Sequence, residues 1–147
     1  MPERQQQAQL VTPERVKSFE RIYEGWDRAL AESDVDGLLA FYAPDATLES
    51  PLVPHLTGAD RGVLRGHAEL RPFFEKLRER KPKIRQYYRT GFLTDGATMM
   101  WEYPRKAEQG EQMDFVEVME VRDDLIRHHR IYWGWYGVKV LMEDRYR

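Results

Sequence analysis

Two glutamates in neighbouring apolar runs could carry acid/base chemistry. Glu102 lies in one run and Glu117 in the next, and apolar side chains flank both. If Gln109 and Gly110 form a two-residue hairpin turn, the two glutamates face each other across the hairpin. Two opposed carboxylates on an apolar face cannot both be charged cheaply, so one of them is expected to exchange a proton near neutral pH. A bulge or another turn would instead point Glu102 outward.

The same register opposes Arg105 to Asp114 and sorts the hairpin into two faces. One face would carry the glutamates together with Met100, Phe115 and Met119, which are therefore candidate ligand contacts. The opposite face is also apolar, so one face must line the interior while the other is covered from outside. A second subunit is the simplest cover, which predicts a homodimer through the outer face of the sheet.

The four histidines lack the spacing of a helical metal site. No HExxH, P-loop or GxGxxG motif occurs, and cysteine is absent, so we expect neither a metal nor another cofactor. His55 lies in the Pro- and Gly-rich segment 51–65, which is expected to be a long loop near the mouth of a pocket. There it would either contact a ligand or be an ordinary exposed histidine.

Aromatic side chains are expected to wall a pocket and to favour flat, ring-bearing ligands over sugars or phosphates. Tyr23 would orient a polar substituent of such a ligand. The aromatic set consists of Phe19, Tyr23, Trp26, Trp133 and Trp135.

The elements that must position these side chains come first as helices and then as strands. A helix starts at Thr12-Pro13, and Ser33 or Asp34 caps a second, shorter helix. Turn signals separate the apolar runs that follow, and the order predicts an α+β fold. We expect a third helix at 66–80 and strands at about 84–93, 97–105, 112–122 and 125–138.

Length and composition indicate one domain. The chain has 147 residues and a formal net charge of -2, which gives no basic footprint for nucleic acid. The start of the chain lacks an apolar signal-peptide core, and no apolar run is long enough for a membrane span. We expect a flexible lead at 1–12, a single domain at 13–147, and a cytoplasmic protein that contacts neither nucleic acid nor membrane.

A helix-to-strand step between Tyr42 and Pro51 is the most specific motif. Pro44 ends the preceding helix, and residues 46–50 then alternate apolar and polar side chains as a half-buried strand does. The step resembles one in the nuclear transport factor 2-like (NTF2-like) superfamily, which includes the ketosteroid isomerases and the SnoaL-type polyketide cyclases. The resemblance runs from about Phe19 to Leu141. It implies a cone-shaped, curved mixed sheet wrapped around three N-terminal helices, an NTF2-like or cystatin-like α+β barrel with an apolar pocket.

The resemblance also implies roles for individual residues. Ketosteroid isomerases hold a Tyr, a general-base Asp and a protonated Asp in their pocket, and the matching positions here are Trp26, Ser50 and Glu117. A serine hydroxyl cannot shuttle a proton between carbons as a carboxylate can. The resemblance places Trp133 in the pocket, and strand parity then places His129 there, whereas a strict two-residue turn at Asp123-Asp124 would point His128 there instead.

Together these features predict a protein that binds a small apolar or aromatic compound with a carbonyl or hydroxyl group. Cofactor-free acid/base catalysis of the isomerase, cyclase or dehydratase type would use Glu117 as proton donor or oxyanion partner and His129 or Glu102 as base. Ser50 would orient the ligand, and Trp26 and Trp133 would be its apolar walls. The alternative is a non-catalytic ligand-binding or dimerisation module.

Overall fold

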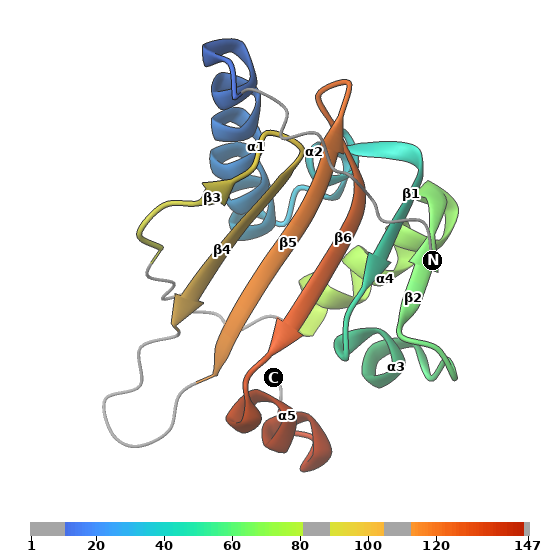
Figure 1. Cartoon of the computed structure of the whole chain (residues 1–147). Coiled ribbons are helices and arrows are strands. Elements are labelled where there is room, and N and C mark those ends of the chain that lie inside the picture. Colours follow the sequence, from blue (N-terminus) through green and yellow to red (C-terminus); the bar gives the residue numbers. More distant parts are fainter. Residues whose placement is uncertain (1–10, 81–88, 105–112, 146–147) are drawn as a thin grey trace, which may run out of the picture.

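Five helices and six strands make up the described part of the chain, which in this computed structural model comprises residues 11–80, 89–104 and 113–145. Four helices and the strands β1 and β2 come before the remaining strands, and a fifth helix follows the last strand (Figure 1). The elements are α1 (Pro13–Glu32), α2 (Val35–Leu39), β1 (Tyr42–Glu49), α3 (Leu52–Thr57), β2 (Val63–Arg65), α4 (Gly66–Arg80), β3 (Leu93–Thr94), β4 (Thr98–Pro104), β5 (Asp114–Arg122), β6 (Leu125–Trp133) and α5 (Trp135–Met142).

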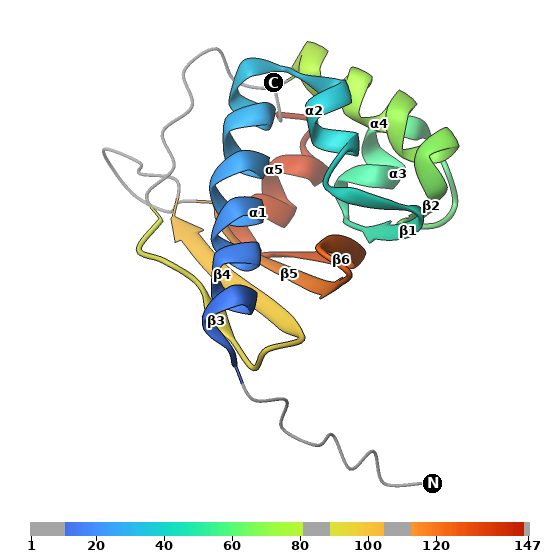
Figure 2. The same cartoon turned by 90° about the horizontal axis from the view of Figure 1, so that it is seen from above.

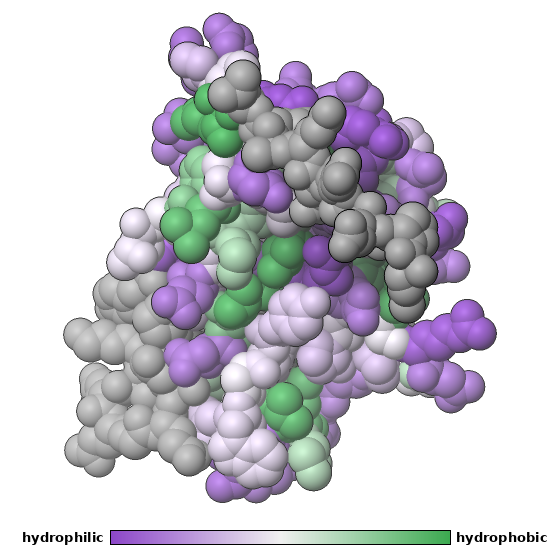
Figure 3. Space-filling view, in the orientation of Figure 1, coloured by the Kyte–Doolittle hydropathy of each residue, from purple (hydrophilic) through white to green (hydrophobic). Residues whose placement is uncertain are grey.

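The strands form one curved mixed sheet in the order β2-β1-β6-β5-β4-β3. Only β1 and β6 run parallel; the other neighbours are antiparallel. The helices lie on one face of this sheet (Figure 2), and the core fills the space between them. Of the described helices none covers the opposite face, where apolar side chains lie among hydrophilic ones (Figure 3). The predicted α+β fold with a curved mixed sheet is confirmed.

The first two helices follow their sequence signals. The Arg15 N–H donates to the Thr12 hydroxyl at 3.3 Å, and Asp34 accepts from the Gly37 N–H at 2.9 Å, so both predicted caps are present. The buried side of α1 consists of Phe19, Ile22, Trp26 and Ala29. Every described helix is too short or too polar to cross a membrane.

Two predicted segments differ from the structure. The stretch 51–65 is not one long loop, because it contains α3 and β2; the Ser50 N–H donates to the Gly62 carbonyl at 2.9 Å and brings the chain back alongside β1. The last strand ends at Trp133 rather than 138, and α5 follows, with Gly137 and Val140 buried three residues apart as helical packing requires. Half of the strand predicted at 84–93 lies outside the described residues. Of the other half, 89–92 are not in a strand, and only Leu93 belongs to β3.

The register of β4 against β5 is one residue away from the predicted one. Trp101 pairs with Glu117, and Glu102 pairs with Val116. A shift of one residue turns every side chain of a strand to the other face. Met100 and Glu102 therefore lie on the exposed face, and the prediction that the two glutamates oppose each other is wrong. The observed register is favoured because it buries large aromatic rings against α1 and leaves the Glu102 charge in water.

A bulge in the β5–β6 hairpin decides which histidine faces inward. Asp123 and Asp124 have φ angles of 54° and 60° and form the predicted two-residue turn. The register then shifts by one residue at Arg127, so that His129, not His128, shares the face of Glu117. The predicted turn is present, but its consequence that His128 faces inward is wrong, because the bulge turns His129 inward instead.

An irregular stretch of β1 brings Tyr42 into the core. The pairing of β1 with β6 shifts between Tyr42 and Thr47, a stretch that contains Pro44, which has no N–H to donate. Nε2 of His67 donates to the Tyr42 carbonyl at 2.9 Å and replaces a lost ladder contact. Gly66, at φ 75°, lets the start of α4 approach this stretch closely.

We predict that Gly66→Ala destabilises the protein more than Gly58→Ala. Both glycines have left-handed φ angles, so each alanine costs about 1–2 kcal/mol. A Cβ at Gly66 would also lie 3.2 Å from the Pro44 carbonyl oxygen, whereas nothing lies within 4 Å of one at Gly58. Chemical denaturation of both variants measures the difference, and equal losses would contradict the close approach.

Candidate functional site

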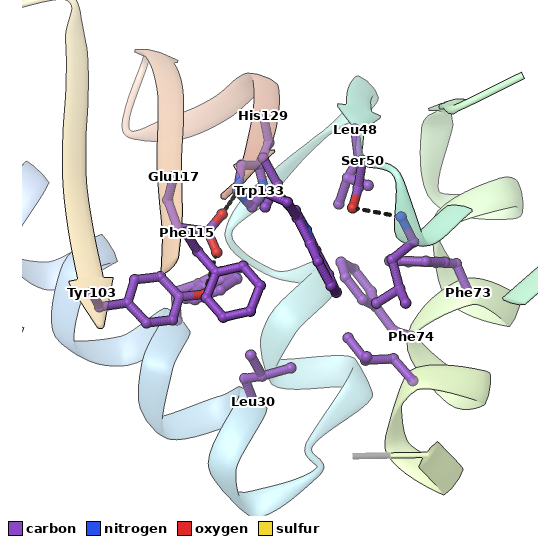
Figure 4. Close-up of a pocket in the computed structure, with 14 residues that line it drawn as sticks. Leu30, Leu48, Ser50, Phe73, Phe74, Tyr103, Phe115, Glu117, His129 and Trp133 are labelled. Carbon is purple, nitrogen blue, oxygen red and sulfur yellow. Dashed lines mark hydrogen bonds and ion pairs between the residues drawn. The ribbon is translucent and has the colours of Figure 1, made fainter. Parts of the chain in front are cut away.

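A small cavity of about 60 Å³ lies between the inner face of the sheet and the helices α1 and α4. Its wall is mostly aromatic and aliphatic, with Glu117, His129 and Ser50 as polar contributors (Figure 4). No lysine or arginine is among the described residues that line it. The cavity is therefore an apolar space with one carboxyl group.

Glu117 is 1% exposed, yet both of its oxygens have hydrogen-bond partners. The Tyr103 hydroxyl donates to Oε1 at 2.6 Å, and Nε2 of His129 lies 2.5 Å from Oε2. Pairing of this kind is what makes a buried carboxyl tolerable. Each oxygen has a second lone pair, so the group can still accept from a ligand.

His129 connects Glu117 to the far wall of the core. Its Nδ1 lies 2.8 Å from the Tyr42 hydroxyl, and the Trp26 indole N–H donates to that hydroxyl at 3.0 Å. Burial raises the pKa of Tyr42, the Trp26 hydrogen bond opposes this, and the charge of Glu117 raises it further. A continuous hydrogen-bonded chain thus runs from Trp26 through Tyr42 and His129 to Glu117.

Ser50 stands where β1 ends and α3 begins. It is 2% exposed, and its hydroxyl oxygen accepts from the Leu52 N–H at 3.1 Å, which holds the first turn of α3 (Figure 4). A serine hydroxyl that accepts one bond still has a proton to donate. Ser50 can therefore serve both the fold and a ligand in the cavity.

Trp133 forms a wall whose position depends on α5. Its ring meets that of Phe115 edge-on, with centroids 4.7 Å apart. A Cβ added to Gly137 would lie only 2.8 Å from Cε3 of Trp133, so only glycine lets α5 pack this closely. The final helix therefore holds the indole against the cavity.

The structure brings six of the predicted site residues to the cavity. They come from helix α1, from the end of β1 and from the paired strands β5 and β6. Met119 faces inward and is buried beside His129 in the register, but it does not line the cavity. The six are Trp26, Ser50, Phe115, Glu117, His129 and Trp133.

Four other predicted site residues lie elsewhere. Glu102 and Met100 are on the outer face, for the register reason given above. Tyr23 packs edge-on against Trp101 and is held by the Arg89 guanidinium over its ring, outside the cavity lining. His55 belongs to α3 rather than to a loop, with Nε2 3.3 Å from an Asp144 oxygen, and it does not line the cavity either.

Sequence reasoning missed Tyr42 and Tyr103. Tyr42 shares the odd-even position of Leu48 and Ser50 along β1, which is a signal that it faces inward. The predicted register puts Tyr103 on the face opposite Glu117, whereas the observed register, one residue away, puts both on the inner face. Within the described residues, no group of three or more His, Cys, Asp or Glu side chains could hold a metal ion.

Comparisons with known proteins agree with this architecture. A sequence profile described as the SnoaL-like domain matches residues 19–129. No curated protein matches the chain.

Several solved structures share the fold at low identity. A SnoaL-like protein of unknown function from Burkholderia thailandensis is 21% identical, with a TM-score of 0.64 over 84% of this chain and 98% of that one. An NTF2-like protein from Anabaena variabilis is 20% identical, with a TM-score of 0.65 over 81% and 88%. TerC, co-crystallised with polyporic acid, is 18% identical, with a TM-score of 0.63 over 88% and 98%.

Proposed function

This chain belongs to the SnoaL-like domain family, and on that premise we propose that its cavity binds a small, neutral compound that carries a carbonyl or hydroxyl group on an apolar or aromatic frame. Glu117 exchanges a proton with this compound without a cofactor. The observation that carries the proposal is a carboxyl group that is 1% exposed and yet lines an apolar cavity.

The lining selects the class of ligand. Apolar walls favour ring-bearing or aliphatic groups, and Glu117 and Ser50 are the polar groups that can accept from or donate to a ligand. An anionic ligand would meet Glu117 without a described lysine or arginine in the lining to offset its charge. Neutral compounds are therefore favoured.

Proton exchange at Glu117 suits the chemistry of enolisable carbonyl compounds. One oxygen of Glu117 takes the proton of a C–H bond next to a carbonyl, and the electron pair of that bond moves to the carbonyl oxygen to form an enolate. Where a C=C bond is conjugated with the enolate, return of the proton to the far carbon of that bond gives an isomer. Return of the proton to a departing hydroxyl gives water and a dehydrated product. Attack of the enolate carbon on a second carbonyl closes a ring, and the alkoxide formed on that carbonyl takes the proton back from Glu117.

Size limits the ligand in the observed conformation. A cavity of about 60 Å³ holds a few water molecules, whereas a cavity of about 150 Å³ accommodates benzene. A ring-sized ligand therefore requires a side chain such as Trp133 to move. The co-crystallisation of TerC with polyporic acid supports the idea that this fold admits a small organic molecule.

A non-catalytic ligand-binding role is the second candidate. Both oxygens of Glu117 and both ring nitrogens of His129 already have partners within the protein, as expected for a network that serves stability alone. This role predicts that ligands bind without exchanging protons.

We predict that Glu117→Gln strongly slows proton exchange with bound carbonyl compounds. Steroid-like, polyketide-like and terpenoid ketones are first screened for those that raise the melting temperature of the wild type. Hydrogen–deuterium exchange next to the carbonyl is then followed by NMR in heavy water. The variant is expected to lose about 10²–10⁴-fold in rate, since an amide cannot take the proton.

Glu102→Gln is the matched control, because it makes the same change on the exposed face. It is expected to keep the wild-type exchange rate. Binding with equal exchange in all three proteins would favour the non-catalytic role. If no compound raises the melting temperature of either the wild type or Glu117→Gln, the ligand proposal is wrong.

We also propose that two copies of the chain associate through the outer face of the sheet. Met100 is 41% and Tyr132 55% exposed on this face, with the half-buried Val116 and Val118 beside them. A second copy would remove these side chains from water.

Sedimentation velocity tests the dimer with a pair of Met→Lys variants. Met100→Lys places a charge in the proposed interface and is expected to give monomers at concentrations where the wild type is dimeric. Met142→Lys, on the more exposed Met142 of α5, is expected to leave the dimer intact. A monomeric wild type, or a dimer that survives Met100→Lys, would overturn the proposal.

A further inference from the structure

The geometry points to Trp26 and Tyr42 as positioning residues that hold the proton of neutral His129 on Nε2, which leaves Glu117 as the group that exchanges a proton. The assignment of the tautomer rests on hydrogen-bond geometry and burial within the protein, without any ligand. Its consequence for catalysis rests on the proposed function.

The direction of the hydrogen-bonded chain is set at its Trp26 end. An indole N–H can only donate, so the Tyr42 oxygen must accept from Trp26 at 3.0 Å. Both side chains are buried, at 4% and 1% exposure, and water therefore does not compete for this contact. Because the Tyr42 oxygen accepts from Trp26, the hydroxyl proton of Tyr42 must be donated to another group.

The group that accepts this hydrogen bond from Tyr42 is His129. Burial raises the pKa of Tyr42, so its hydroxyl stays protonated and acts as a donor. Its neighbour is Nδ1 of His129 at 2.8 Å. An Nδ1 that accepts a hydrogen bond carries no proton, and a neutral imidazole with a bare Nδ1 has its proton on Nε2.

The far side of the ring agrees with this tautomer. Nε2 of His129 lies 2.5 Å from Oε2 of Glu117, which is closer than an ordinary N–H···O bond, and an Nε2–H has this carboxyl oxygen as its acceptor. The Tyr103 hydroxyl donates to the other oxygen at 2.6 Å. Every donor in the chain Trp26, Tyr42, His129 then has an acceptor, and Glu117 receives two donors as an ionised carboxylate.

This tautomer gives His129 and Glu117 different roles. His129 has no free lone pair, because Nδ1 accepts from Tyr42 and Nε2 carries its proton. Glu117 still has a second lone pair on each oxygen and lines the cavity. A substrate proton therefore goes to Glu117, and His129 is the donor that holds the carboxylate in place.

Nitrogen-15 NMR of the imidazole rings tests the tautomer directly in the ligand-free protein. The chain has four histidines, so His55→Gln, His67→Gln and His128→Gln assign the remaining signal by elimination. Near neutral pH the wild type is expected to show a bare, hydrogen-bonded Nδ1 and a protonated Nε2 for His129. It should also show a slowly exchanging Tyr42 hydroxyl proton close to that ring. A protonated Nδ1, alone or together with Nε2, would overturn the proposal.

Tyr42→Phe tests the positioning role, since it removes the hydroxyl and keeps the ring. The variant is expected to lose the single tautomer and show exchange between the two forms. Tyr103→Phe is the matched control: it removes the other donor to Glu117 without touching Nδ1, and the Nε2–H tautomer should persist. A pure Nε2–H tautomer in Tyr42→Phe would show that Glu117 alone sets it. If Tyr42→Phe does not fold, the wild-type Tyr42 hydroxyl signal decides the matter.

This readout is independent of any ligand. A wild type with the expected tautomer but without proton exchange on any compound would leave the positioning role standing and contradict the proposed function. Proton exchange that depends on Glu117, together with a protonated Nδ1 on His129, would support the proposed function and contradict the positioning role.

Discussion

A carboxylate buried among aromatic rings needs hydrogen-bond donors, and the core of this protein is arranged around that need. Glu117 is 1% exposed and accepts from Tyr103 and from His129. Removing a charge from water without such partners costs several kcal/mol. The same two donors leave the group accessible from the cavity, so one interaction serves both stability and the chemistry that we propose.

Small irregularities in the strands bring together the side chains that hydrogen-bond to Glu117 and His129. The bulge at Arg127 turns His129 inward, and the irregular stretch of β1 places Tyr42 against the other side of its ring. The register of β4 brings Tyr103 to the face of Glu117. Regular strands would break this arrangement, because a shift of one residue reverses the face of each side chain.

The sequence predicts the order of helices and strands better than it predicts which side chains contact one another at the cavity. Caps at Thr12 and Asp34 and apolar periodicity identify α1 and α2, because these signals are local, whereas α3 and α5 were not predicted. The face of Glu102 and Tyr103 depends on the register of a hairpin, and a turn of a different length moves both. His129 was placed correctly only by family resemblance, since periodicity alone does not reveal a bulge. Tyr42 was missed because its partners are 16 and 87 residues away along the chain.

The charge of Glu117 is the central claim, and infrared spectroscopy measures it most directly. The difference spectrum between the wild type and Glu117→Gln near neutral pH isolates the vibrations of this one side chain. We predict that the wild type contributes the bands of an ionised carboxylate. The carbonyl stretch of a buried, protonated carboxylic acid in that spectrum would contradict the account.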